Sequence, residues 1–87
     1  MTVYVDHAHI SYGRMQMSHM MADSELELHR MAQNIGLKRE WFQGDHYDVS
    51  KQKRANAIRL GDVPVSSRFL VQLRQQQRSG SARARED

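Results

Sequence analysis

With 87 residues, the chain is long enough for one domain and too short for two of ordinary size. Hydrophobic residues make up 39% and charged residues 26%, which excludes a wholly disordered chain. The absence of cysteine excludes disulfides, thiolate catalysis and cysteine-based zinc sites. The net charge of +3 is uneven: residues 1–37 hold two basic and four acidic side chains, and residues 38–87 hold eleven and six. The basic second half favours anionic partners.

Both ends of the chain bear on where the protein acts and how much of it folds. The first nine residues lack the basic and apolar stretches of a secretory signal. No apolar run approaches the roughly 18 residues of a membrane span. We therefore expect a cytoplasmic protein with no membrane partner. Residues 79–87 contain no apolar side chain larger than alanine, so we predict one domain over residues 1–78 and a disordered polar tail over 79–87.

Two strands are predicted near the amino terminus. Residues 2–5 are mainly β-branched and aromatic, which is typical of a buried strand, and this strand ends at Asp6. Residues 7–13 have no helical period and contain a glycine, which indicates a loop. Residues 15–21 place methionine or histidine at every second position, which favours a second strand.

The clearest predicted element is a helix that begins after Ser24. Ser24 and Glu27 have the spacing of a capping box, in which each side chain accepts from a backbone N–H of the first turn. Gly36 suits the left-handed position just after a helix. The apolar face repeats at helical spacing through Leu28, Met31, Ala32 and Ile35.

The second half predicts two more helices and short extended segments. Residues 41–43 are interpreted as a strand or an extended loop. Ser50 is a candidate helix cap, followed by a helix over residues 51–60. Residues 63–65 form a very short predicted strand whose proline favours an edge or the start of a strand. The third helix begins at one of the next two serines and frays over residues 75–77.

Because strands and helices alternate, the predicted class is α/β: a single small domain with a mainly parallel sheet of three or four strands and three helices. In such sheets the loops after the strands share one edge, where ligands bind. The polar residues expected near that edge are the predicted ligand-binding site: Asp6, Arg14, His19, Gln43, His46, Tyr47, Ser50, Lys51 and Arg54.

An anionic small ligand that contains phosphate is the partner this set favours. Free backbone N–H groups at the start of a helix attract phosphate, and Lys51 and Arg54 add positive charge there. Tyr47 offers a ring for stacking on a base, and Asp6 is expected to orient its neighbours. The glycine-rich motifs of ordinary nucleotide-binding folds are absent. We therefore predict a binding module for such a ligand, including nucleotides, that senses or sequesters it.

Metal-dependent phosphodiester hydrolysis, as in a nuclease, is one alternative left open. Histidines and aspartates supply the required donor atoms, and two of them are spaced as His46-x-Asp48. No established metal-binding motif is present, so no metal or cofactor is predicted, and whether the protein is an enzyme is left open. The full set of candidate ligands is Asp6, His7, His9, His19, Asp23, His46 and Asp48.

Nucleic-acid binding is the other alternative. A stripe of basic residues would follow a phosphate backbone. Its members are Lys51, Lys53, Arg54, Arg59, Arg68, Arg74 and Arg78. A homo-oligomer is also expected, because a short chain has a thin core and the methionines at residues 15, 17, 20 and 21 offer an adaptable contact surface.

Several separated motifs resemble, in the same order, a small domain-of-unknown-function family of short proteins encoded in bacterial and phage genomes. They are VYVD at 3–6, HMMAD at 19–23, ELHRMA at 27–32, IGLKREWFQ at 35–43, HYDVS at 46–50 and LGDVPVSSR at 60–68. The resemblance covers residues 2 to 74 and implies no particular activity. Where the family pattern has Gly-Ala, this chain has Gly61-Asp62, and its His7-Ala8-His9 segment is unusual.

Overall fold

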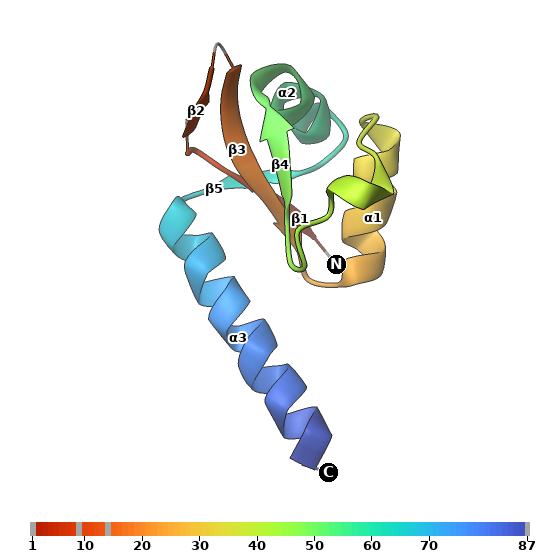
Figure 1. The fold of residues 1–87 in the computed structure, drawn as a ribbon, viewed down its shortest axis with the longest axis vertical. Coiled ribbons are helices and arrows are strands. Elements are labelled where there is room, and N and C mark those ends of the chain that lie inside the picture. Colours follow the sequence, from red (N-terminus) through yellow and green to blue (C-terminus); the bar gives the residue numbers. More distant parts are fainter. Residues whose placement is uncertain (1, 9, 14, 87) are drawn as a thin grey trace.

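The structure is a computed structural model that describes the backbone of residues 2–8, 10–13 and 15–86, and the side chains of these residues except 10, 12 and 79–86. Its elements in chain order are β1 (Val3–Asp6), β2 (Ile10–Tyr12), β3 (Met15–Ala22), α1 (Glu25–Asn34), the 3₁₀ helix η1 (Arg39–Trp41), β4 (Tyr47–Ser50), α2 (Lys51–Arg59), β5 (Val63–Val65) and α3 (Ser67–Glu86) (Figure 1). The predicted disordered tail, residues 79–87, lies outside the described side chains and stays a prediction.

The strands form one mixed sheet, which confirms the α/β class and the three predicted helices. β3 pairs with β1 and β2 along one edge and with β4 along the other, and all three pairs are antiparallel. β5 extends the sheet beyond β1 as its parallel neighbour. The prediction of a mainly parallel sheet is therefore wrong.

The path of the chain between β3 and β4 explains this difference. Two strands joined by a helix are parallel when the helix returns the chain to the end of the sheet at which the first strand began. Here α1 runs back from the end of β3, and residues 35–46 then return to that end before β4 begins (Figure 1). The register pairs Tyr47 at the start of β4 with Met20 and Ser50 at its end with Met17. The pair is therefore antiparallel although a helix lies between the strands.

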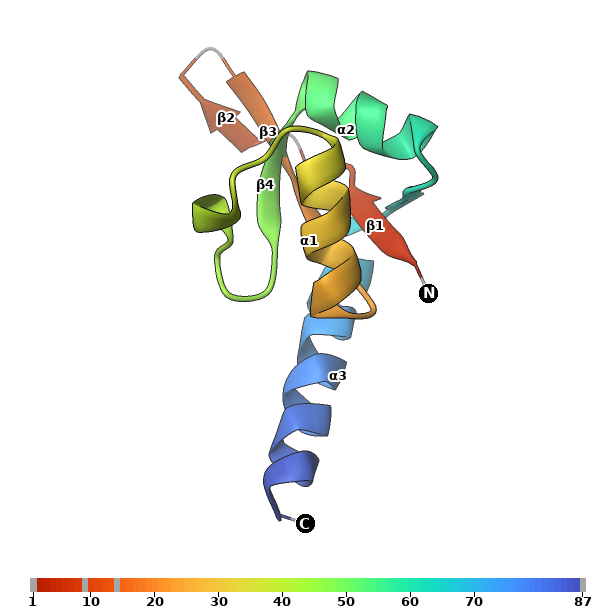
Figure 2. The ribbon, with the colours of Figure 1, turned by 90° about the vertical axis from the view of Figure 1, so that its right-hand side faces the viewer.

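The hydrophobic core lies between one face of this sheet and helices α1 and α2. Figure 2, seen from that side, shows both helices in front of the strands. Both strands and helices contribute buried side chains to this core, which include Val3, Val5, Met20, Ala22, Leu28, Ala32, Tyr47, Val49 and Ala57. We call this side the apolar face of the sheet.

Helix α1 begins and ends as its sequence predicts. The Ser24 hydroxyl accepts a hydrogen bond from the N–H of Glu27 at 3.3 Å. Gly36 has a φ of 83°, which favours glycine, and the N–H of Leu37 donates to the carbonyl of Ala32 at 2.8 Å. These contacts satisfy backbone groups that the helix ends leave unpaired.

Three short segments differ from the sequence analysis. The residues predicted as a loop after Asp6 include the strand β2. Part of the segment at 41–43 belongs to η1, which is followed by an extended residue. Residues 47–50, expected only to lead into a helix cap, form the strand β4. Strands this short are specified by pairing with β3 more than by their own composition.

Two further observations concern partners. Met20 and Met21 are buried, so only part of the expected methionine contact surface is exposed; the homo-oligomer stays a prediction. Within the described residues, we find no helix that is both long and apolar enough to cross a membrane.

Candidate metal and ligand site

Polar side chains gather on the face of the sheet that points away from α1 and α2. In β4, Asp48 lies between Tyr47 and Val49, which are both buried in the apolar face. His19 is the register partner of Asp48 on β3. Since neighbouring residues of a strand point to opposite faces, His19 and Asp48 share the other face. We call this side the polar face.

A break in the β-sheet places Asp6 beside His19. β1 pairs with β3 as far as Val5, and pairing resumes only at Ile10 of β2. The backbone N–H of His19 therefore faces a gap in the ladder, and Oδ1 of Asp6 accepts its hydrogen bond at 2.9 Å. A carboxylate takes the place of a strand carbonyl at this point.

Asp6 is held by four hydrogen-bond donors although its side chain is only 1% exposed. Oδ1 accepts from the N–H groups of His19 and, at 3.2 Å, of Ala8; Oδ2 accepts from Nδ1 of His19 at 2.8 Å and from the Ser67 hydroxyl at 3.2 Å. Burial raises the pKa of Asp6, but the hydrogen bonds and the charge of the His19 ring outweigh it, so the pKa lies below its ordinary value. Asp6 is therefore an ionised, fixed acceptor.

Carboxylates fix both imidazoles through the same ring nitrogen. Because ionised Asp6 only accepts, Nδ1 of His19 donates to it, and a neutral ring keeps its lone pair on Nε2. Nδ1 of His46 lies 2.6 Å from Oδ1 of Asp45 in the same manner. Its Nε2 faces Oδ1 of Asp48 at 3.4 Å. Histidines that bind metal ions in proteins usually donate their second ring N–H to such a carboxylate.

His19, His46 and Asp48 together form what we call the ligand cluster. One donor atom from each lies within 4.8 Å of those of the other two. The side chains are 31%, 20% and 33% exposed, so the cluster is open to solvent yet supported by the protein. Nε2 of Gln43 donates to Oδ2 of Asp48 at 2.6 Å, which orients that carboxylate.

The structure brings four of the nine predicted site residues together: Asp6, His19, Gln43 and His46. They meet on the polar face of the sheet: Asp6 and His19 lie in β1 and β3, and Gln43 and His46 lie in the segment that leads into β4. Asp48 and Asp45 belong to the same group. The sequence analysis considered Asp48 only as a candidate metal ligand. His46 directly precedes β4, and its spacing of two residues from Asp48 is the signal that both side chains lie on one side of the chain.

Tyr47 points the other way. Its side chain is buried in the apolar face, where the hydroxyl lies 2.8 Å from Nδ1 of His29 and the ring packs on Phe42 with centroids 5.5 Å apart. Burial raises its pKa above the ordinary value. The ring is therefore enclosed and does not offer a stacking surface for a base.

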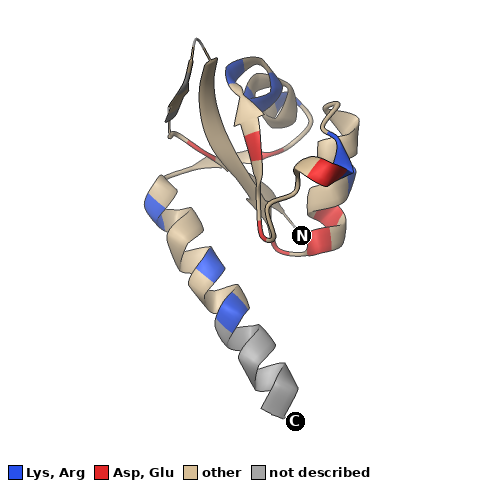
Figure 3. Ribbon diagram, viewed as in Figure 1, with Lys and Arg blue, Asp and Glu red and all other residues tan. Residues whose placement is uncertain are grey.

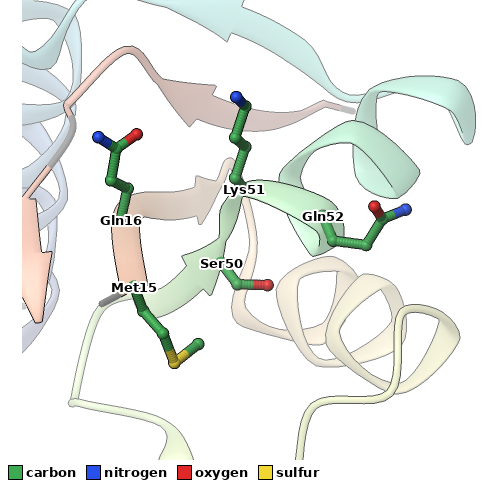
Figure 4. A pocket seen from close by; sticks show the side chains of 5 residues that line it. All are labelled: Met15, Gln16, Ser50, Lys51 and Gln52. Atoms are coloured by element: carbon green, nitrogen blue, oxygen red, sulfur yellow. The ribbon is translucent and has the colours of Figure 1, made fainter. Parts of the chain in front are cut away.

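Ser50 and Lys51 lie at the start of α2 and are not members of the ligand cluster. The Ser50 hydroxyl accepts from the N–H of Lys53 at 3.3 Å, so it caps the helix as predicted. Both residues line a shallow hollow of about 280 Å³ together with Met15, Gln16 and Gln52. Figure 4 shows the side chains of this hollow turned in different directions, so they do not converge on one anion.

Arg54 reaches from α2 to the end of β1. Its Nε donates to the carbonyl of Asp6 at 2.8 Å, and a terminal nitrogen lies 3.1 Å from Nδ1 of His7. Arg54 therefore secures the strand end that carries Asp6. The ninth predicted residue, Arg14, lies outside the described residues, as does His9.

The basic stripe divides between α2 and α3 (Figure 3). Besides Arg54, two of its members are held within the fold. Nζ of Lys53 donates to the carbonyl of Ile35 at 2.9 Å, and Nε of Arg74 lies 2.5 Å from Oδ2 of Asp45. These side chains stabilise the domain or its polar face, which leaves fewer of them to contact a phosphate backbone.

Fold and site together define a small mixed α/β domain with a candidate metal-binding cluster on the polar face of its sheet. The chain belongs to the family described as "Protein of unknown function (DUF4031)", which it matches over residues 3–77. This confirms the resemblance to a domain-of-unknown-function family, while the bacterial and phage origin stays an expectation. Comparison with curated proteins and with solved structures gave no match.

Proposed function

We propose that the protein binds one divalent transition-metal ion through His19, His46 and Asp48, and that the bound ion recognises a phosphate-containing anion. The observation that carries the proposal is the ligand cluster itself, with two imidazoles and a carboxylate within 4.8 Å of one another. Imidazole and carboxylate donors suit Zn²⁺ and Mn²⁺. Oriented donors on paired strands lower the cost of assembling such a site.

The charges around the cluster also favour a cation. Asp6, Asp45 and Asp48 bring three carboxylates to the polar face, and Arg74 is the basic side chain paired among them. With neutral imidazoles this group has a net charge of −2. A divalent ion would neutralise it, which supports an ion of that charge over a monovalent one.

The number of protein ligands supports the second half of the proposal. Zinc in a structural site usually has four protein ligands, whereas three leave a position for water or another molecule. The exposed fractions of the three side chains leave that position accessible from solvent. A phosphate oxygen is a suitable donor for a hard or borderline cation. In this proposal the phosphate group of the predicted ligand binds at the open coordination position of the metal ion.

Isothermal titration of the metal-free protein with Zn²⁺, and separately with Mn²⁺, tests metal binding. We expect one ion per chain for the wild-type protein and loss of that binding in His46→Ala. His29→Ala is the matched control, because His29 lies on the opposite side of the sheet and hydrogen-bonds to Tyr47. Equal loss in both variants, or no binding by the folded wild-type protein, would contradict the proposal.

Phosphate binding is then tested with the metal-loaded protein. Inorganic phosphate and adenosine monophosphate are titrated into the Zn²⁺ form and into the metal-free form. Binding that requires the metal supports the proposal, and comparison of the two ligands shows whether the nucleoside contributes. Equal binding with and without Zn²⁺ would place the anion elsewhere.

Metal-dependent phosphodiester hydrolysis is the second candidate, and the incomplete ligand set favours it. A bound ion lowers the pKa of its water and polarises a phosphoryl oxygen. His19, His46 and Asp48 would orient the ion; water would add to phosphorus, the ester P–O bond would break, the aryl oxide would leave as an anion and the proton of the water would pass to solvent. Release of nitrophenolate from bis(p-nitrophenyl) phosphate, dependent on Zn²⁺ or Mn²⁺ and lost in His46→Ala, is expected. Phosphate binding without this turnover would exclude hydrolysis of this substrate and favour a protein that only binds its ligand.

A further inference from the structure

Helix α3 docks on the polar face through one row of side chains. Ser67, Leu70, Arg74 and Gln77 follow each other at spacings of three and four, which aligns them on one side of a helix. Leu70 is buried, and Nε2 of Gln77 donates to the carbonyl of Ala22 at the end of β3 at 2.7 Å. Figure 1 shows α3 on the side of the sheet away from α1 and α2.

Two contacts of this row end on the carboxylates that hold the imidazoles. The Ser67 hydroxyl donates to Oδ2 of Asp6, the oxygen that also accepts from His19. Nε of Arg74 pairs with Oδ2 of Asp45, whose other oxygen contacts His46. Each imidazole of the ligand cluster is therefore linked to α3 through one carboxylate.

We infer that α3 sets the orientation of both imidazoles, with Ser67 and Arg74 as positioning residues that act through Asp6 and Asp45. The consequence for metal affinity rests on the proposed function. The inferred arrangement makes the docked helix a regulator of the site: α3 on the sheet holds both rings ready for an ion, and α3 displaced releases both.

The geometry explains why one helix can hold two rings together. Ser67 and Arg74 are separated by two helical turns, or roughly 10 Å along the axis. A helix is stiff over that length, so neither contact can shift far while the other and Leu70 remain docked. Arginine presents several donors in a rigid plane, which fixes a carboxylate in orientation as well as position. A carboxylate that is itself fixed by hydrogen bonds restricts the orientation of the histidine ring that it accepts from.

The first measurement needs no metal. Long-range ¹H–¹⁵N correlation spectra at a pH of about 8.5, where imidazole is ordinarily neutral, report which ring nitrogen of each histidine carries the proton. We expect protonated Nδ1 for His19 and His46 in the wild-type protein, and a mixture of both tautomers in the Ser67→Ala/Arg74→Ala double variant. Arg68→Ala is the matched control, because Arg68 is an exposed residue of the same helix.

The second measurement is Co²⁺ affinity, followed by the visible absorption of the bound ion. The double variant should bind at least about tenfold more weakly than the wild-type protein, as when supporting residues of other metal sites are removed. Arg74→Lys, which keeps the charge, should recover part of the loss relative to Arg74→Ala. Circular dichroism confirms that each variant is folded, and the single variants serve if the double variant is not.

The two proposals fail in different ways. Unchanged tautomers in a folded double variant would overturn the role of α3, whatever the metal result. Normal Co²⁺ affinity and spectrum in the double variant, with wild-type binding intact, would also overturn it. Fixed tautomers in the wild-type protein, mixed tautomers in the double variant and no bound Co²⁺ in either would instead contradict the proposed metal function and support the positioning by α3.

Discussion

The two faces of the sheet are built from the same strands but differ in what they bury. The apolar face packs Val5, Met20 and Val49 against two helices. The polar face, one residue away along each strand, carries Asp6, His19 and Asp48. Burial of apolar side chains on the first face stabilises the domain, whereas the partly buried polar groups of the second face carry a desolvation cost. Adjacent residues in this sequence therefore have separate roles, which substitutions can distinguish.

The largest loss of stability is expected from Asp6→Ala. The variant removes the acceptor of several partly buried donors, including the N–H and the ring of His19. Breaking a buried charged network of this kind costs about 3–5 kcal/mol in the free energy of unfolding. Urea denaturation measures it. A loss below about 1 kcal/mol, the value typical of an exposed ion pair, would show that the network is not a structural element.

Met20→Ala and His19→Ala compare the two faces directly, since these neighbours point in opposite directions. Met20 is fully buried, and its truncation should lower the free energy of unfolding by about 2–5 kcal/mol. His19→Ala should abolish the binding of Zn²⁺ with a smaller effect on stability. Chemical denaturation and zinc titration of both variants check the pair. If both properties fall together in each variant, the faces are not independent.

Asp62 is the exception on the apolar side. It is 4% exposed, and neither carboxylate oxygen has a hydrogen-bond partner among the described residues, in contrast to Asp6. Burial raises the pKa of Asp62 from 3.8 to about 7. The folded protein then holds a proton that the unfolded chain releases between about pH 4 and 7, so the free energy of unfolding falls as pH rises through this range.

Asp62→Ala should remove that fall. At a pH above 7 the variant should be more stable than the wild-type protein by on the order of 2–4 kcal/mol. Thermal and urea unfolding between pH 4 and 8 provide the measurement, with Asp23→Ala as a control for an exposed aspartate. A wild-type protein that gains stability as pH rises from 5 to 7, with no difference from the variant, would contradict the burial of an unpaired carboxylate.

Arg54→Ala is expected to have the smallest of these effects. Arg54 donates to the carbonyl of Asp6, and a hydrogen bond to a charged group contributes about 1.5–3 kcal/mol. The sequence predicted it as a ligand contact, for which the variant would lose affinity and keep its stability. Unfolding curves and titration of the metal-loaded variant with inorganic phosphate separate the two roles, and an unchanged stability with lost phosphate binding would restore the earlier interpretation.

The parts of the fold that depend on local sequence were predictable. Ser24, Glu27 and Gly36 mark the ends of α1, and alternation over residues 15–21 marks β3. Strand direction was not predictable, because it depends on how residues 35–46 return across the sheet. β4 carries too short a pattern to be recognised without its partner strand, so its Asp48 was not assigned to the ligand-binding set.

The candidate site was predictable in composition more than in geometry. Asp6, His19, Gln43 and His46 were expected together, but at a sheet edge formed by loops. The break between β1 and β2 that brings Asp6 to His19, and the docking of α3 on Asp45, involve residues far apart in the chain. Tyr47 and Asp48 show the limit most clearly, since strand alternation sends one to the core and the other to the cluster.

Anomalous X-ray diffraction from crystals of the Zn²⁺-loaded protein tests the central claim most directly. Data on either side of the zinc absorption edge should show one peak at roughly 2.0–2.2 Å from an imidazole nitrogen of His19, an imidazole nitrogen of His46 and a carboxylate oxygen of Asp48. The same map for His46→Ala should lack the peak. A zinc peak bound elsewhere, with these three side chains in contact only with one another and with Asp6 and Asp45, would contradict the account.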